Sequence, residues 1–152
     1  MRFSNSLALV LFLLSSQFAS SAPIISEPQL VLVTSASSSI NQLTTEDVRL
    51  LYLGATKTIN GKPIHPLLNR SDGYLLELFM QKVLFMSAST YERRILSRAF
   101  RLGDNRPSSF SGVHQLISAL KADPNAVTYM YSDEAGAHPD IKILAVLWKK
   151  NN

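Results

Sequence analysis

The sequence predicts an α/β domain in which a mixed central sheet is flanked by helices. Two observations predict this class: short runs of strand-forming residues lie near both ends of the chain, and apolar residues at helical spacing occur in the segments between them. The chain of 152 residues, 46% of them hydrophobic, is long enough for one globular domain with its own core. It contains no cysteine, which excludes disulfide frameworks, thiolate metal sites and cysteine nucleophiles.

The N-terminal segment has the features of an export signal. Met1 and Arg2 give a positive start, residues 7–14 form an unbroken apolar run, and small residues follow up to Ala22. The apolar run is much shorter than the about 20 residues that a membrane-spanning helix needs. We therefore predict a signal peptide over residues 1–22, a periplasmic domain over residues 23–152, and no membrane span after cleavage.

The mature domain is expected to be only mildly basic. The whole chain has a formal net charge of +4, from 15 Lys and Arg against 11 Asp and Glu, and loss of Arg2 with the signal peptide leaves +3. A small positive charge is compatible with a small anion, an anionic lipid or nucleic acid. Because export makes nucleic acid the least suitable of these partners, we expect no nucleic-acid binding.

The first predicted elements are a strand and a helix. Residues 30–33 form a continuous apolar run bounded by a polar stretch, which is typical of a buried strand. Thr44 can cap a helix whose apolar face begins at Val48 and whose end is marked by Gly54. Asn60 and Gly61 then predict a hairpin turn, because both residues accept a positive φ.

A strand over residues 64–68 and three helices follow in the prediction. Apolar residues recur at helical spacing through residues 74–86, which indicates a buried helix. Ser89, with Glu92 three residues later, has the spacing of a capping box that opens a second helix, which Gly103 closes.

The last predicted helix and two strands complete the domain. The third helix starts near Val113 and must stop near Asp123, because Pro124 disfavours helical geometry in the residue before it. Residues 126–131 and 141–148 are rich in strand formers, and residues 132–140 between them are predicted to be a loop.

Several short motifs follow one another over residues 31–147. They are Leu43-Thr44-Thr45-Glu46-Asp47-Val48 before Leu51-Tyr52-Leu53-Gly54, Asn60-Gly61 with Ile64 and Pro66, Phe79 with Val83-Leu84, Phe100 with Gly103 and Pro107, and Pro124-Asn125-Ala126-Val127-Thr128-Tyr129. In this order the chain resembles the short phosphate ABC transporter substrate-binding family, relatives of the periplasmic phosphate-binding proteins. The resemblance implies a single periplasmic-binding-protein-like lobe that binds phosphate or a related oxyanion without catalysis.

The resemblance also implies where the anion binds. Larger relatives hold phosphate with an arginine and a Ser-Gly-Thr type turn at a helix start, and this chain has Arg70, Ser71, Asp72 and Gly73 there, followed by Tyr74 in place of a small hydroxyl residue. Backbone N–H groups at a helix start favour an anion, and Arg70 can offer a bidentate fork. The alternative is that Ser71 or Asp72 only caps the helix.

Two further residues are candidates for the same site. Thr34 and Ser35 follow the first predicted strand, and open α/β sheets commonly bind ligands at strand ends. The alternative is an ordinary polar loop.

A row of arginines offers a different kind of surface. Arg94, Arg98 and Arg101 share one helix face by their spacing, with Arg93 and Arg106 nearby, so the helix could meet an anionic partner or simply face solvent. The sequence has no Gly-rich phosphate loop, dinucleotide fingerprint or Gly-x-Ser-x-Gly elbow, and its three histidines are widely separated. We therefore predict no cofactor, no metal site and no enzymatic activity.

Two functions are consistent with these features. The first is an exported module that binds phosphate or a related oxyanion and works with the membrane component of an ABC transporter. The second is a periplasmic protein-interaction module that keeps the same lobe without efficient solute capture.

Export is the first testable prediction. We expect removal of the first 19 to 22 residues, to leave an N-terminus close to Pro23, because the small residues that suit signal peptidase lie there. Intact mass and N-terminal sequencing of the protein from the periplasmic fraction measure it. Full-length protein recovered from the membrane fraction would contradict the prediction.

Overall fold

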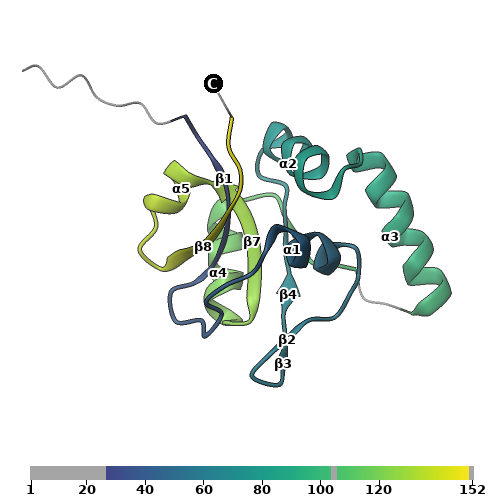
Figure 1. Cartoon of the computed structure of the whole chain (residues 1–152), viewed down its shortest axis with the longest axis horizontal. Coiled ribbons are helices and arrows are strands. Elements are labelled where there is room, and N and C mark those ends of the chain that lie inside the picture. Colours follow the sequence, from purple (N-terminus) through teal and green to yellow (C-terminus); the bar gives the residue numbers. More distant parts are fainter. Residues whose placement is uncertain (1–26, 104–105, 151–152) are drawn as a thin grey trace, which may run out of the picture.

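The computed structural model describes residues 27–103 and 106–150, so the predicted signal peptide lies outside the described residues. A four-stranded sheet stands at the centre, and helices cover both of its faces (Figure 1). The strands are β1 Leu30–Ser35, β2 Thr58–Ile59, β3 Lys62–Pro63, β4 His65–Pro66, β5 Leu68–Asn69, β6 Ser109–Phe110, β7 Ala126–Tyr131 and β8 Ile141–Trp148. The helices are α1 Thr45–Tyr52, α2 Gly73–Phe79, α3 Ala88–Leu102, α4 Val113–Ala122 and α5 Ser132–Gly136, with a π-helical turn, η1, over Met80–Leu84.

The central sheet is mixed, as the sequence predicts. Its strand order is β4-β7-β1-β8. Strand β1 runs antiparallel to both β7 and β8, whereas β4 runs parallel to β7. Strands β2 and β3 form a separate hairpin, and β5 pairs in parallel with β6. In the described part of the chain β8 has β1 as its one strand neighbour, so its other edge is open.

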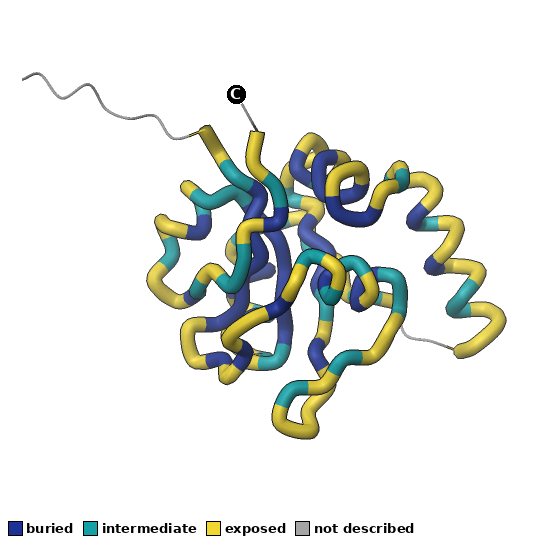
Figure 2. The backbone as a smooth tube through the Cα atoms, in the orientation of Figure 1, coloured by how far each residue is buried: buried dark blue, intermediate teal, exposed yellow. Residues whose placement is uncertain are grey.

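Side chains of the central strand β1 alternate between the two faces of the sheet, and the core is accordingly divided into two clusters. Leu30 and Leu32 of β1 join the cluster under α1, α2 and α3, whereas Val31 and Val33 join the cluster under α4 and α5. Successive side chains of a strand point to opposite faces, so a continuous apolar run is what a strand covered on both faces requires. Figure 2 shows β1 and β7 as mostly buried, while α3 is mainly exposed.

The predicted start of the fold is confirmed. Thr44 caps α1 in a capping box: its hydroxyl accepts from the Asp47 N–H at 3.1 Å, and the Asp47 carboxylate accepts from the Thr44 N–H at 3.0 Å. The hairpin turn has positive φ at both Asn60 (52°) and Gly61 (74°). In each case the local residues alone determine the geometry, which is why the sequence predicts it.

The predicted helix over residues 74–86 is shorter and less regular than expected. It is α-helical only to Phe79, continues as the π-helical turn, and ends where Phe85 adopts a left-handed conformation with φ 56°. The π turn allows Met80, Val83 and Leu84 all to be buried. Helical spacing alone cannot predict this change of period.

The predicted capping box at Ser89 and Glu92 is wrong. Ser87 caps α3, because the chain has just left the left-handed turn, and its hydroxyl accepts from the Thr90 N–H at 3.2 Å. The Glu92 carboxylate binds arginine side chains instead of the backbone. Gly103 ends the helix with φ 67°, as predicted.

Two other expectations are corrected. The segment 132–140 is not entirely a loop, because α5 forms there and buries Ala135; five residues are too few to show a helical period. The predicted strand over residues 64–68 is divided into β4 and β5, which pair with different strands, β7 and β6. The change of partner comes after Leu67: the N–H groups of His65 and Leu67 donate to carbonyls of Asn125 and Val127, whereas the Leu68 N–H donates to the Ser108 carbonyl at 2.8 Å. Strands β7 and β8 and the end of α4 agree with the prediction.

No helix of the described residues has both the length and the apolar character needed to cross a membrane.

The capping box gives a prediction for the pH dependence of stability. Lys57, and then the Thr44 backbone, hold the pKa of Asp47 at about 2, below its ordinary value of 3.8. The ionised carboxylate therefore stabilises the fold above about pH 4, and this contribution is lost as the pH falls through about 2. We expect Asp47→Asn to lower the free energy of unfolding by about 1 kcal/mol at pH 7 and by much less near pH 2.

Urea unfolding of both proteins across this pH range measures the difference. Asp140→Asn is the control, because Asp140 is exposed and its partner Lys121 forms a surface ion pair. A cost for Asp47→Asn that does not change with pH would contradict the assignment.

Candidate functional site

The six predicted site residues lie at two separate places. Thr34 pairs with Val127 near the start of β7, whereas the Asn69 amide donates to the Tyr129 carbonyl further along the same strand. The predicted turn at Arg70 follows Asn69, so it lies toward the opposite end of β7 from Thr34. This separation arises because β1 runs antiparallel to β7 and β4 runs parallel to it.

Thr34 and Ser35 belong to the sheet and not to a loop. Both side chains are buried, and β1 extends through them, two residues further than predicted. The Thr34 hydroxyl donates to the Ala126 carbonyl at 2.7 Å, and the Ser35 hydroxyl lies 2.9 Å from that of Ser37. The Thr34 hydroxyl therefore ties β1 to the start of β7, and the Ser35 hydroxyl supports the turn that follows β1.

The turn after β5 is organised by Asn69, which is fully buried. Its side-chain oxygen accepts from the N–H of Ser71 at 3.0 Å and from the Ser71 hydroxyl at 2.6 Å. Its amide nitrogen donates to the Tyr129 carbonyl at 2.9 Å. Asn69 therefore ties the turn to the central strand β7.

Asp72 caps α2. Its carboxylate accepts from the backbone N–H groups of Tyr74 at 2.7 Å and Leu75 at 3.2 Å. The capping alternative therefore describes Asp72, and the N–H groups of Tyr74 and Leu75 are already satisfied, whereas anion binding by the backbone of residues 71–73 stays a prediction. Gly73, the first residue of the helix, is exposed.

Arg70 extends away from this helix start. Its guanidinium pairs with one carboxylate oxygen of Glu92 on α3, and the Arg106 guanidinium pairs with the other oxygen at 2.9 Å. Two fixed positive charges thus meet one negative charge. The three side chains are between 38% and 50% exposed, so solvent reaches them.

A cavity of about 290 Å³, which we call the arginine cavity, lies at these charges. Leu68, Tyr91 and Ser109 line it together with Arg70, Glu92 and Arg106. The Tyr91 hydroxyl donates to the Tyr52 carbonyl at 3.0 Å. Burial raises the pKa of Tyr91, although the nearby charges of Arg70 and Arg106 act in the opposite direction. Tyr91 is therefore a neutral wall of the cavity.

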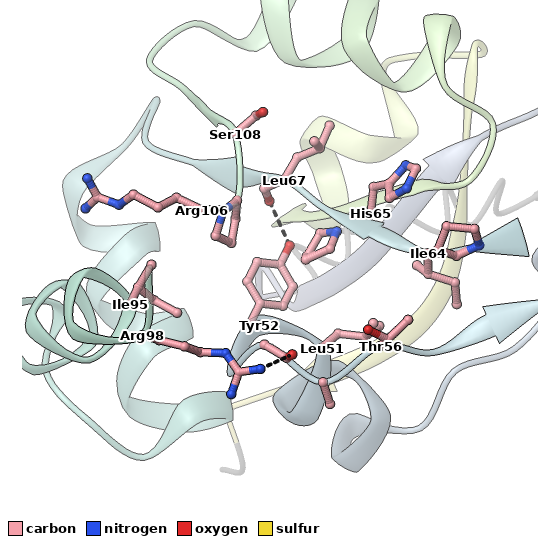
Figure 3. Close-up of a pocket in the computed structure, with 15 residues that line it drawn as sticks. Leu51, Tyr52, Thr56, Ile64, His65, Leu67, Ile95, Arg98, Arg106 and Ser108 are labelled. Carbon is pink, nitrogen blue, oxygen red and sulfur yellow. Dashed lines mark hydrogen bonds between the residues drawn. The ribbon is translucent and has the colours of Figure 1, made fainter. Parts of the chain in front are cut away.

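A second cavity of about 370 Å³, the Tyr52 cavity, lies between α3 and the segment around β4 (Figure 3). Ile95, Arg106 and Pro107 line both cavities, so the two adjoin. The Tyr52 hydroxyl donates to the Leu67 carbonyl at 2.7 Å. On the α3 side Arg98 donates to the Gly54 carbonyl at 3.0 Å.

The predicted arginine row does not act as one surface. Arg98 folds back onto Gly54, Arg101 donates to the Ser97 carbonyl of its own helix at 3.4 Å, and Arg94 is exposed. The grouping of Arg70, Glu92 and Arg106 is not among the features predicted from the sequence. Its one signal in the sequence is that Glu92 stands among several arginines.

No group of three or more His, Asp or Glu side chains in the described residues could hold a metal ion.

The comparisons with known proteins concern the fold. No family model matches the chain, and no curated protein matches it by sequence. A crystal structure of an ABC-type phosphate transport receptor from Vibrio cholerae is similar with a TM-score of 0.57 and 14% identity over 77% of this chain and 45% of that one. The crystal structure of PstS from Borrelia burgdorferi is similar with a TM-score of 0.56 and 13% identity over 82% of this chain and 49% of that one.

The chain thus spans about half the length of these two structures. The similarity confirms the predicted fold class, α/β with a mixed central sheet flanked by helices, and this fold is shared with a lobe of the two structures. At 13–14% identity the similarity shows the fold alone and assigns no role to any residue of the site.

The role of Asn69 gives a stability prediction. Asn69→Ala leaves the buried Tyr129 carbonyl and the Ser71 N–H without their partner, and each such group typically costs about 1–3 kcal/mol. We expect the free energy of unfolding, measured in urea, to fall by at least about 2 kcal/mol. The exposed residue Asn41 provides the control Asn41→Ala. Equal losses in the two variants would show that Asn69 does not organise the turn.

Proposed function

We propose that this chain is an exported solute-binding module for phosphate or a related oxyanion, and that Arg70 and Arg106 hold the anion in the arginine cavity. The observation that carries the proposal is that two guanidinium groups share the single carboxylate of Glu92 beside a cavity of about 290 Å³. An anion would balance the remaining positive charge. The module is non-catalytic and needs no cofactor or metal.

The chemistry of arginine supports this choice. Each guanidinium has five N–H donors in a planar fork, and its contact with Glu92 uses only part of them. The remaining donors can bind the oxygens of a tetrahedral anion, and the Ser109 hydroxyl in the cavity wall can donate as well. Because Arg70 and Arg106 are partly exposed, solvent and salt screen their charges, and we expect affinity to fall as salt rises.

The turn of Ser71, Asp72 and Gly73 has a supporting role in this proposal. Asn69 and Asp72 fix its backbone, and so fix the point from which the Arg70 side chain leaves. The turn therefore positions Arg70 and does not itself supply the main donors. Thr34 and Ser35, which are buried in β1, take no part.

The comparisons support the class of function. One of the two structures with a similar fold is an ABC-type phosphate transport receptor, and a lobe of about half its length would provide one side of such a site. We extend the proposal to periplasmic localisation after loss of residues 1–22, and to the membrane component of an ABC transporter as partner.

Binding of inorganic phosphate tests the proposal. In isothermal titration at low salt we expect Arg70→Ala and Arg106→Ala each to lower the affinity about ten- to a hundredfold, because a hydrogen bond to a charged group is worth about 1.5–3 kcal/mol. Arg93→Ala is the matched control, since Arg93 is an exposed arginine next to Glu92 on α3 and does not line the arginine cavity. Wild-type protein that binds neither phosphate nor sulfate contradicts the proposal.

Glu92 provides an independent test of the same site. Its carboxylate competes with the anion for both guanidinium groups and repels it, so Glu92→Gln should strengthen phosphate binding several-fold in the same titration. Weaker binding in this variant would mean that Glu92 is needed to hold the arginines in place.

A second function is favoured by the outer face of α3. Leu96 is 43% exposed and Phe100 is 83% exposed, one turn apart and away from the buried Tyr91 and Ile95. A pair of exposed apolar side chains beside Arg93 suits a protein-interaction surface. The protein-interaction function is favoured over oxyanion binding if the wild type binds no oxyanion and the single substitution Phe100→Ser abolishes association with the transporter membrane component.

A further inference from the structure

The arginine cavity does not end at its charged side chains. Ile95, Arg106 and Pro107 form a shared boundary with the Tyr52 cavity. The volumes of about 290 and 370 Å³ are each near the lower end of the range of about 300–1,000 Å³ that is common for small-molecule sites. A free phosphate ion is compact and would occupy only the arginine cavity.

One part of the wall of the Tyr52 cavity is apolar, and another part carries the polar residues Thr56, His65 and Ser108. Leu51, Tyr52, Ile64 and Ile95 contribute side chains that are almost completely buried. Tyr52 is held by its hydrogen bond to the Leu67 carbonyl and by edge-on contacts with two other aromatic rings. Because these contacts exist without a ligand, an apolar group can enter without first ordering the wall.

Arg98 closes one end of this cavity. Its guanidinium donates to the Gly54 carbonyl, and a Cβ atom at Gly54 would collide with the Arg98 Nε. Gly54 also has φ +96°, which favours glycine. Arg98 is therefore fitted against the backbone as part of the wall.

Arg106 stands where the two cavities meet. Its guanidinium pairs with Glu92 in the arginine cavity, and Figure 3 shows it pointing away from the Tyr52 ring. A ligand at the junction would thus have donors on one side and the apolar walls of Leu51, Tyr52 and Ile64 on the other.

From this juxtaposition we infer that the ligand is an oxyanion ester with a small apolar substituent, such as a phosphate monoester. The phosphoryl group binds Arg70 and Arg106, and the substituent fills the Tyr52 cavity. This inference rests on the proposed oxyanion function and narrows its ligand class.

Three probes test the inference by isothermal titration: inorganic phosphate, methyl phosphate and phenyl phosphate. We expect phenyl phosphate to bind about ten- to a hundredfold more tightly than inorganic phosphate, because burial of a phenyl ring typically contributes a factor of that order. Methyl phosphate separates the effect of an ester from that of an apolar group, and it should bind much like inorganic phosphate.

The position of the ring is measured directly. We expect nuclear Overhauser effects between the phenyl protons and the methyl groups of Leu51 and Ile64, which line the Tyr52 cavity only. Thr56→Phe should reduce the preference for phenyl phosphate, because Thr56 lines this cavity. Thr58→Phe, at a nearby exposed position that does not line it, is the matched control.

The outcomes separate the two levels of the argument. If phosphate binds in an Arg70- and Arg106-dependent manner but phenyl phosphate binds no more tightly, the inference is wrong and the proposed function stands. If none of the three probes binds, the proposed function fails and the inference fails with it. Tight phenyl phosphate binding without contacts to Leu51 and Ile64 would also overturn the inference.

Discussion

The reciprocal hydrogen bonds between Asn69 and Tyr129 are the constraint on which the rest of the structure depends. The Asn69 amide donates to the Tyr129 carbonyl, and the Tyr129 hydroxyl donates to the Asn69 carbonyl at 2.8 Å. These two buried hydrogen bonds attach β5 to the central strand β7. The Tyr129 ring then stacks on Phe79 with centroids 3.7 Å apart, and Tyr52 packs edge-on against both. The Asn69 amide therefore ties the turn that carries Arg70 to β7, and the Tyr129 ring packs α1 and α2 against the same point.

Helix α3 completes the candidate site with little buried surface of its own. Of its side chains, Tyr91 and Ile95 are buried, and both line the arginine cavity. Polar contacts provide the remaining attachment: Glu92 reaches Arg70 and Arg106, and Arg98 reaches Gly54. The width of both cavities is thus determined by the same few contacts that hold this helix against the domain. Charge and shape in the candidate site are coupled, because Glu92 both attaches α3 to the domain and would compete with the proposed anion for the two guanidinium groups.

The sequence predicts those features that local residues determine. The capping box of α1, the Asn60-Gly61 turn, the end of α3 at Gly103 and the limits of β7 follow from short-range rules. The direction of β1 relative to β7 depends on pairing between distant segments, so Thr34 could not be placed correctly from the residues around it. Glu92 likewise has the right spacing for a capping role, and only the tertiary fold brings Arg70 and Arg106 to it. The arginine at position 70 was recognised, but the partners of its guanidinium were not.

The two edges of the central sheet differ in how well they resist joining another strand. At one edge β4 is two residues long and includes Pro66, which cannot donate a backbone hydrogen bond. At the other edge β8 is eight residues long, and Ile143 and Val146 are about half exposed on it. An exposed edge of this kind is a template for strand addition, and charged residues or irregular pairing are common protections. Here the register shifts in the β1–β8 pair supply irregular pairing, whereas the Lys142 ammonium donates to the Ser38 carbonyl at 2.7 Å, so the resistance of this edge to strand addition depends on the bulged pairing with β1.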